Sequence, residues 1–333
     1  ADAPRHRQAW RDRCQMIERC DLHLDKTGCL PQTTWVPPPY RHPIGGEDKV
    51  NRLCTLTAPS KDPLAHLLLD KAGVLASTGQ DTGVMAHYFI TGASSGIGAA
   101  LAEALLARGE TVTAVARRED RLKSLKTGRG TLLTAACDVT DAAALAKAIG
   151  AARDAQGPID SAILNAGMYE PQDGTKIDPA VYARHMDVNY MGVVNALPAL
   201  VEGMLAHGSG QIAVVSSVAG WRGLPKAAAY GPTKAALISL AESLTFDLAP
   251  RGIDVKVICP GFVETESTAV NDYEMPGLMS AETAAREIMS GLETRNFLIQ
   301  FPTSFTRKMG LLRWLPDRTF FRLVGSRTGH PQP

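Results

Sequence analysis

The stretch AAAYGPTK, residues 227–234, contains a tyrosine and a lysine suited to act together on a proton. Tyr230 and Lys234 are four positions apart, so on a helix they lie on one face, one turn from each other. A free tyrosine has a pKa of about 10, and a neighbouring ammonium group stabilises the phenolate and lowers that pKa. The pair could therefore serve acid–base chemistry near neutral pH. The same spacing also occurs on helices without any chemistry, so the remainder of the chain must decide.

A glycine-rich turn, TGASSGIG at residues 91–98, lies between an apolar strand pattern and an Ala- and Leu-rich helix pattern. Gly92 permits a sharp exit from the strand, Gly96 lets the backbone approach a pyrophosphate, and Gly98 lets the helix pack close to the sheet. The N–H groups at the start of that helix attract phosphate. A tight connection without a ligand is the alternative, but the strand before and the helix after favour dinucleotide binding.

From residue 87 onward, apolar strand patterns alternate with helix patterns, which is typical of a parallel sheet covered by helices on both faces. The predicted strands span 87–92, 111–117, 131–139, 159–167, 210–220, 253–261 and 296–301. The predicted helices span 98–110, 118–126, 179–206, 227–249 and 280–291. We therefore expect an α/β fold with a single doubly wound parallel-sheet domain of Rossmann type over residues 85–301.

The spacing TGxxxGxG resembles that of the short-chain dehydrogenase/reductase family, and further motifs of that family occur in order. Asp138–Val139 follows the third strand, NAG at 165–167 follows the fourth, and PGFVET occupies 260–265. Asn189 lies within VNYMG, and Ser217 lies thirteen residues before Tyr230. The resemblance covers about residues 87–300. Two departures, Leu164 for a second Asn and Pro232–Thr233 inside YxxxK, remove no group that the chemistry needs.

The resemblance implies an oxidoreductase that interconverts a carbonyl and an alcohol with a nicotinamide cofactor. It implies that Tyr230 transfers the proton, that Lys234 tunes Tyr230 and holds the ribose, and that Ser217 polarises the substrate oxygen. Asn189 would anchor a water that leads from Lys234 to solvent. The implied cofactor-binding residues are Gly92, Ser94, Ser95, Gly96, Ile97, Arg117, Arg118, Asp138, Val139, Asn165, Ala166, Gly167, Tyr230, Lys234, Pro260, Gly261, Val263 and Thr265.

The end of the second strand predicts the choice of cofactor. An acidic residue there would hold the ribose hydroxyls of NAD and repel a 2′-phosphate. This chain has Ala116 at that position, followed by Arg117 and Arg118. Guanidinium groups bind phosphate in a forked geometry, so NADP(H) is favoured over NAD(H). Arg117 is the better candidate, because Arg118 could simply begin a solvated helix face. Ser95 is neutral and is not expected to add a second phosphate contact.

Residues 1–84 differ from the remainder and are expected to form a poorly structured extension outside the fold. Four of the six cysteines fall there, and only residues 62–76 have a helical pattern. A zinc site is the alternative for this extension, with Cys14, Cys20, His23 and Cys29 as ligands. Their spacing lacks the close CxxC pairs of structural zinc sites, which disfavours zinc.

Residues 302–333 form a basic, aromatic-rich C-terminal tail, interrupted by Pro302 and Pro316. Its only acid is Asp317. Such a tail could lie on an anionic membrane surface, but packing over the substrate pocket or a subunit interface is favoured. The family resemblance implies a homodimer or homotetramer.

Composition excludes other functional classes. The formal net charge of +1 gives no case for nucleic-acid binding, residues at the start of the sequence lack the charged-then-apolar pattern of a signal peptide, and no apolar run approaches the length of a membrane span. A cytoplasmic location is therefore expected. Few charges follow Gly261, which predicts a fairly apolar small-molecule substrate. Two alternatives remain open: an NADP(H)-binding sensor with little turnover, and an epimerase or dehydratase that shares YxxxK.

Overall fold

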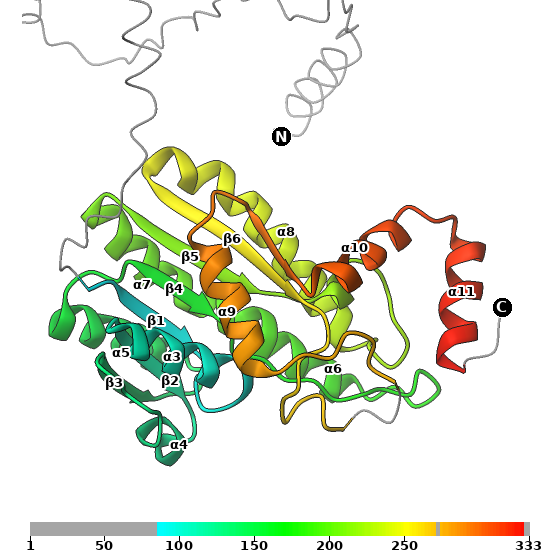
Figure 1. Cartoon of the computed structure of the whole chain (residues 1–333), viewed down its shortest axis with the longest axis horizontal. Helices are drawn as coiled ribbons and strands as arrows, with labels where there is room; N and C mark the ends of the chain where they lie inside the picture. The colour runs from blue at the N-terminus through cyan, green and yellow to red at the C-terminus, as the bar shows by residue number, and fades with distance from the viewer. Residues whose placement is uncertain (1–84, 271–273, 330–333) are drawn as a thin grey trace, which may run out of the picture. The chain divides into compact units, whose positions relative to one another are not determined.

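The computed structural model describes residues 85–270 and 274–329, so the predictions for residues 1–84 lie outside the described residues. The described part contains a seven-stranded parallel sheet in the order β3-β2-β1-β4-β5-β6-β7. Its strands are β1 His87–Thr91, β2 Thr111–Ala116, β3 Thr131–Ala136, β4 Ser161–Leu164, β5 Gly210–Val215, β6 Ile253–Pro260 and β7 Leu298–Phe301. The chain winds outward from β1 in both directions, so the predicted doubly wound fold is confirmed (Figure 1).

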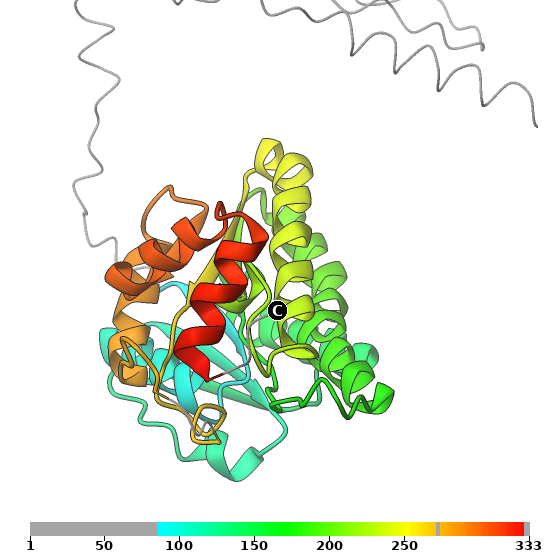
Figure 2. The same ribbon diagram turned by 90° about the vertical axis from the view of Figure 1, so that its right-hand side faces the viewer.

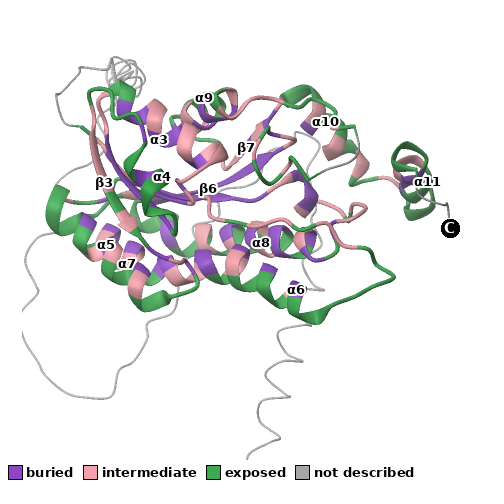
Figure 3. Ribbon diagram, turned by 90° about the horizontal axis from the view of Figure 1, so that it is seen from below, coloured by how far each residue is buried: buried purple, intermediate pink, exposed green. Residues whose placement is uncertain are grey.

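Helices cover both faces of the sheet. On one face lie α3 (Gly96–Arg108) and α9 (Ala281–Leu292), and on the other lie α5 (Ala142–Gln156), α7 (Gly192–His207) and α8 (Tyr230–Leu248) (Figure 3). The shorter helices are α4 (Glu119–Lys123), α6 (Pro179–His185), α10 (Thr303–Leu312) and α11 (Asp317–Thr328). All six residues of β2 are buried, as expected for a central parallel strand with helices on both sides.

Three strands end earlier than predicted. β3 stops at Ala136, β4 at Leu164 and β5 at Val215, whereas the apolar patterns extended to 139, 167 and 220. The residues that follow leave the sheet at its carboxyl edge. Several predicted site residues therefore lie just after the strands and not within them. Ligands of open α/β sheets bind beyond this edge.

The predicted helix 179–206 is interrupted by a π-helical segment, Met186–Met191, between α6 and α7. A π turn holds one more residue than an α turn, which rotates the side chains that follow. Asn189 lies in this wider turn and is completely buried. The periodicity of apolar residues could not reveal such a local insertion.

The C-terminal residues form two helices, α10 and α11, which the sequence interpretation did not assign. Pro302 and Pro316 precede them directly, a position that suits proline because the first helical residues need no hydrogen-bonded N–H. Figures 1 and 2 show both helices beyond the carboxyl edge of the sheet. Among the described residues, no helix has the length and hydropathy needed to cross a membrane.

We expect Lys256→Met to destabilise the fold by about 2–3 kcal/mol, to be measured by urea unfolding. Lys256 is fully buried in β6, and its Nζ donates to the carbonyl oxygens of Thr294 (2.6 Å) and Asn296 (3.1 Å) and lies 3.0 Å from Asp254 Oδ2. Methionine fills similar space but leaves these acceptors without a donor. Lys147→Met, at an exposed position on α5, is the control and should change stability by less than about 0.5 kcal/mol. Equal losses of stability in the two variants would contradict the stabilising role assigned to Lys256.

Candidate functional site

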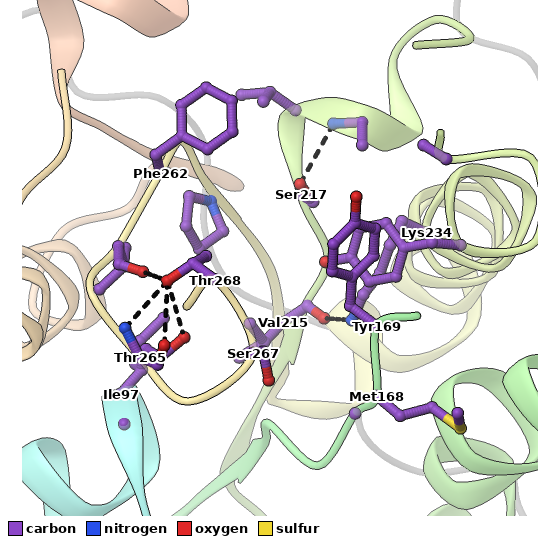
Figure 4. A pocket seen from close by; sticks show the side chains of 18 of the residues that line it. Ile97, Met168, Tyr169, Val215, Ser217, Lys234, Phe262, Thr265, Ser267 and Thr268 are labelled. Atoms are coloured by element: carbon purple, nitrogen blue, oxygen red, sulfur yellow. Dashed lines mark hydrogen bonds between the residues drawn. The ribbon is translucent and has the colours of Figure 1, made fainter. Parts of the chain in front are cut away.

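One cavity of about 1220 Å³ lies at the carboxyl edge of the sheet. It is lined by all the residues that the sequence predicted for the cofactor, and also by Ser217 (Figure 4). Most of these residues come from the ends of six strands and the loops that follow them, and the remainder from the first turns of α3 and α8. Asn189 does not line the cavity and lies buried behind its wall.

The glycine turn is shaped as the sequence predicted. Gly92 has φ +70° and Gly96 has φ +55°, a backbone region that side chains rarely adopt. A Cβ on Gly98 would lie 2.4 Å from the Gly92 carbonyl oxygen, so only glycine permits this close packing of α3 on β1. Asn165 fixes the turn from the next strand, because its Nδ2 donates to the carbonyl oxygens of Thr91 (3.1 Å) and Gly92 (3.3 Å).

The start of α3 fits a phosphate group. Ser95 is the N-cap residue but its side chain does not cap the helix, and the first turn contains no acid. The N-terminal end of the helix dipole therefore faces a cavity lined by Ser94, Ser95, Gly96 and Ile97. These features fit a dinucleotide pyrophosphate.

Arg118 reaches back over the glycine turn. Its Nη2 donates to Ser95 Oγ (2.7 Å) and Ser94 Oγ (3.2 Å), and its Nη1 lies 2.9 Å from Glu266 Oε2. Arg118 does begin α4 as its N-cap residue, but its side chain is held at the cavity by three polar groups. Glu266 was not among the predicted residues. The contact with Arg118 is the main reason why the pKa of its carboxyl lies below the ordinary value.

Arg117 lies on the other side of this region. Its side chain is 76% exposed, and its Nη1 is 3.8 Å from Asp138 Oδ2. Hydrogen bonds from Thr140, first of all from its backbone N–H, lower the pKa of Asp138. Val139, the next residue, packs closely against Gly192. A Cβ on that glycine would lie 2.6 Å from Val139 Cγ2. The Asp138–Val139 pair thus forms a fixed wall of the cavity.

Tyr230, Ser217 and Lys234 converge at the opposite end of the cavity. Tyr230 begins α8, and Ser217, after β5, makes a hydrogen bond with its side chain. Lys234 lies one turn further along α8, with Nζ 5.5 Å from the centroid of the Tyr230 ring. The Lys234 Nζ donates to the Val215 carbonyl oxygen (2.8 Å; Figure 4). The predicted spacing therefore corresponds to a cluster in space.

Burial dominates the acid–base properties of this cluster. It raises the pKa of Tyr230 to about 12, although the hydrogen bond from Ser217 lowers that pKa in part. Burial also lowers the pKa of Lys234 to about 8. The pKa of Tyr230 thus lies above its ordinary value, contrary to the expectation that Lys234 brings it below, because burial disfavours the phenolate.

Asn189 is held from three directions. Its Oδ1 accepts from the backbone N–H of Met168 (2.7 Å), and its Nδ2 donates to Met168 O (3.0 Å) and Thr233 Oγ1 (3.1 Å). A Cβ on Gly167 would lie 3.3 Å from Asn189 Oδ1 and 3.5 Å from Lys234 Nζ. Both polar side chains therefore border the same space beside Gly167.

The loop after β6 closes over the glycine turn. A Cβ on Gly96 would lie 2.9 Å from Thr265 Cγ2, so this loop touches the turn directly. Thr268 organises the loop, because its Oγ1 donates to Val263 O (2.7 Å) and accepts from Thr265 N (3.0 Å; Figure 4). Pro260, Gly261 and Val263 are thereby placed along the cavity wall.

Several lining residues carried no recognisable signal in the sequence. Tyr169 packs edge-on against Tyr230, with ring centroids 5.1 Å apart. The helices α10 and α11 also line the cavity, through Phe305, Met309, Leu312, Leu323, Val324, Arg327 and Thr328. The favoured interpretation that the C-terminal tail packs over the pocket agrees with this placement.

Arg222 attaches the C-terminal helices to the loop after β5. Its Nη1 donates to the carbonyl oxygens of Leu312 (2.9 Å) and Leu315 (2.7 Å), and its Nη2 lies 2.6 Å from Asp317 Oδ1. Its guanidinium also stacks on the Phe320 ring, 3.9 Å from the centroid. One partly buried cation therefore holds the turn between the two helices. No group of His, Cys, Asp or Glu suited to a metal ion occurs in the described part of the chain.

The lowered pKa of Lys234 predicts a pH dependence of stability. In the unfolded chain this lysine stays charged up to about pH 10.5, but in the cofactor-free fold only up to about pH 8. The unfolded chain thus binds one more proton between these values, so the free energy of unfolding rises with pH there. Relative to Lys234→Met, the parent should gain on the order of 3 kcal/mol across this window.

Urea unfolding of both proteins at a series of pH values measures this difference. In the folded protein, the pKa values of Tyr230 and Cys259 are both raised to about 12, so both groups stay neutral through the window. Their ionisation in the unfolded chain is common to both proteins. The lowered pKa of Lys234 would be contradicted if the difference in free energy of unfolding between the two proteins stayed constant between pH 8 and 10.5.

Comparison with known proteins agrees with this geometry. The family model described as short chain dehydrogenase matches residues 86–275. An uncharacterized oxidoreductase of Myxococcus xanthus (strain DK1622) is 34% identical over 235 residues, which are 69% of this chain and 93% of the relative. A short chain dehydrogenase from Burkholderia cenocepacia J2315 in complex with NADP is 27% identical, with a TM-score of 0.63 over 74% of this chain and 98% of that one. A 3-oxoacyl-[acyl-carrier protein] reductase with bound NAD from Brucella melitensis is 28% identical, with a TM-score of 0.58 over 65% and 89%. The chain belongs to the short-chain dehydrogenase family of oxidoreductases.

Proposed function

We propose that this protein is an NADP-preferring oxidoreductase that interconverts a carbonyl and an alcohol. The observation that carries the proposal is the convergence of Tyr230, Ser217 and Lys234 in the same cavity as the glycine turn. The residues fit a dinucleotide that extends from α3 to Lys234, and when bound its nicotinamide supplies or accepts the hydride.

Tyr230 delivers the proton to the substrate oxygen. With a pKa raised to about 12 it is protonated at neutral pH, which is the form needed for carbonyl reduction. Ser217 hydrogen-bonds both the substrate oxygen and the phenolate that Tyr230 becomes. Lys234 adds positive charge beside the ring, which matters most when the phenolate has formed.

Lys234 and Asn189 return the proton to Tyr230. A lysine with a pKa of about 8 exchanges its proton readily near neutral pH, unlike an ordinary lysine. Its Nζ and Asn189 Oδ1 border the space beside Gly167, which suits a water that links the two. This arrangement supports the relay to solvent that the family resemblance implies.

We expect Tyr230→Phe to lower kcat/KM for carbonyl reduction by about 10²–10⁴-fold, because the variant keeps the ring but has no proton to give. The measurement is NADPH oxidation with a panel of aldehydes, ketones and quinones, beside NADPH binding by fluorescence. NADPH affinity should stay within about threefold of the parent. Tyr182→Phe, on α6 and outside the cavity, is the matched control and should retain full activity.

Three outcomes would redirect the proposal. A Tyr230→Phe variant as active as the parent would remove the assigned proton donor. Tight NADPH binding without turnover of any panel compound would favour the sensor alternative instead. Racemisation or dehydration without net NADPH oxidation would favour the epimerase or dehydratase.

The preference for NADP rests on Arg118 more than on Arg117. Arg118 and the hydroxyls of Ser94 and Ser95 form a compact set of donors at the turn, and such a set suits a 2′-phosphate. The solved neighbours include one with NADP and one with NAD, so they do not favour either cofactor. Glu266 already holds Arg118, and its carboxylate competes with a phosphate for the same guanidinium.

We expect Arg118→Ala to raise the KM for NADPH by about 10–100-fold, the usual cost of a charge-assisted hydrogen bond, while the KM for NADH changes by less than about threefold. Steady-state kinetics with both cofactors and one fixed carbonyl measure the difference.

Two variants accompany this measurement. Arg117→Ala should affect NADPH less than Arg118→Ala, because its side chain projects into solvent. Glu266→Gln should lower the KM for NADPH, since it frees Arg118 without removing it. Equal losses for NADPH and NADH in Arg118→Ala would show that Arg118 does not contact a 2′-phosphate.

A further inference from the structure

The C-terminal segment exposes three large apolar side chains, on α10, on the turn that follows it and on α11. Leu311 is 71% exposed, Trp314 is 86% exposed and Phe321 is 49% exposed. None of the three lines the cavity, whereas other residues of the same helices, such as Met309 and Leu323, do. Exposed apolar side chains of this size in one short segment mark an interaction surface.

Basic residues surround these apolar side chains. On α10, Arg307 and Lys308 lie one turn before Leu311, and on α11, Arg318 lies one turn before both Phe321 and Arg322. We call Leu311, Trp314, Phe321, Arg307, Lys308, Arg318 and Arg322 the C-terminal patch. Within residues 85–270 and 274–329, none of its four cations forms an ion pair. Their charge is therefore available to a partner.

The charge is concentrated in this segment. Residues 302–329 contain six Lys and Arg against one acid, Asp317, whereas the entire chain has a formal net charge of only +1. Asp317 is moreover engaged by Arg222. The partner of this segment must therefore be anionic.

An exposed tryptophan and leucine beside long cationic side chains is the pattern of a surface that enters the headgroup region of a bilayer. The apolar tips enter the acyl boundary, while the guanidinium groups stay at the level of the phosphates. A second copy of this chain fits less well, because two such patches would oppose like charges. We infer that the C-terminal patch docks this protein on an anionic lipid bilayer.

The patch is held in shape without a lipid. Arg222 fastens the turn between α10 and α11 through the carbonyl oxygens of Leu312 and Leu315, and Phe320 is buried beneath its guanidinium. Docking therefore needs no refolding of the helices, which lowers its entropic cost. The cavity lies directly under the same two helices, so a docked protein holds its cavity next to the bilayer.

Vesicle binding by the full chain tests the inference. We expect co-sedimentation with phosphatidylcholine vesicles that contain phosphatidylglycerol, and binding to pure phosphatidylcholine vesicles at least about tenfold weaker. Tryptophan emission should shift to shorter wavelength on binding, and Trp314→Phe should remove most of that shift while the protein still sediments. Added salt should weaken binding.

Three variants make the test specific to the patch. Arg318→Gln with Arg322→Gln should weaken binding to anionic vesicles by about 30-fold. The triple change Leu311→Ala, Trp314→Ala and Phe321→Ala should weaken it at least as much. Ile177→Ala, an exposed apolar position outside the patch, is the matched control and should not change binding.

The inference fails if the parent does not sediment, or if neutral and anionic vesicles bind it equally. It also fails if the patch variants bind as the parent does. Concentration-dependent self-association without vesicles that the triple change abolishes would assign the patch to a second copy instead. NADPH oxidation in the absence of vesicles should be unaffected by the patch variants, which separates this result from any failure of the proposed enzymatic activity.

Discussion

The hydrogen bonds from the Asn165 side chain to the ends of β1 and the glycine turn are the interaction on which the site depends. They join β1 to β4 at the point where the strand order reverses, which is where a doubly wound sheet opens toward a ligand. Asn165 Nδ2 also occupies the space beside Gly98, so the same amide sets how closely α3 approaches the sheet. The position of the α3 N-terminus, and with it the phosphate end of the cavity, follows from this one side chain.

At the other end of the cavity, desolvation decides the behaviour of the ionisable groups. Tyr230 and Lys234 are pushed in opposite directions, the phenol toward its protonated form and the amine toward its neutral form. Both shifts favour uncharged groups, as expected where burial penalises the charged form.

The sequence predicted the sheet, its principal helices and the residues of the cofactor cavity, because buried parallel strands and glycine turns follow strong local rules. It could not predict features that depend on long-range packing. The π turn that carries Asn189 has no signature in apolar periodicity, and the choice between Arg117 and Arg118 depends on contacts with Ser95 and Glu266. The expected direction of the Tyr230 pKa shift was wrong for a related reason, because residue spacing reveals a neighbouring charge but not the extent of burial.

Arg222 attaches the two C-terminal helices through contacts that depend little on the identity of their side chains. It lies eight residues before Tyr230, and apart from its stacking on Phe320 its contacts are to main-chain carbonyls and to an acid at the start of a helix. Most side chains of the two C-terminal helices can therefore vary without loss of these contacts. New lining residues or a new outer surface could be installed there while the strand ends that hold the dinucleotide keep their geometry. Proteins with the same reacting residues could accordingly differ in substrate and in location within the cell.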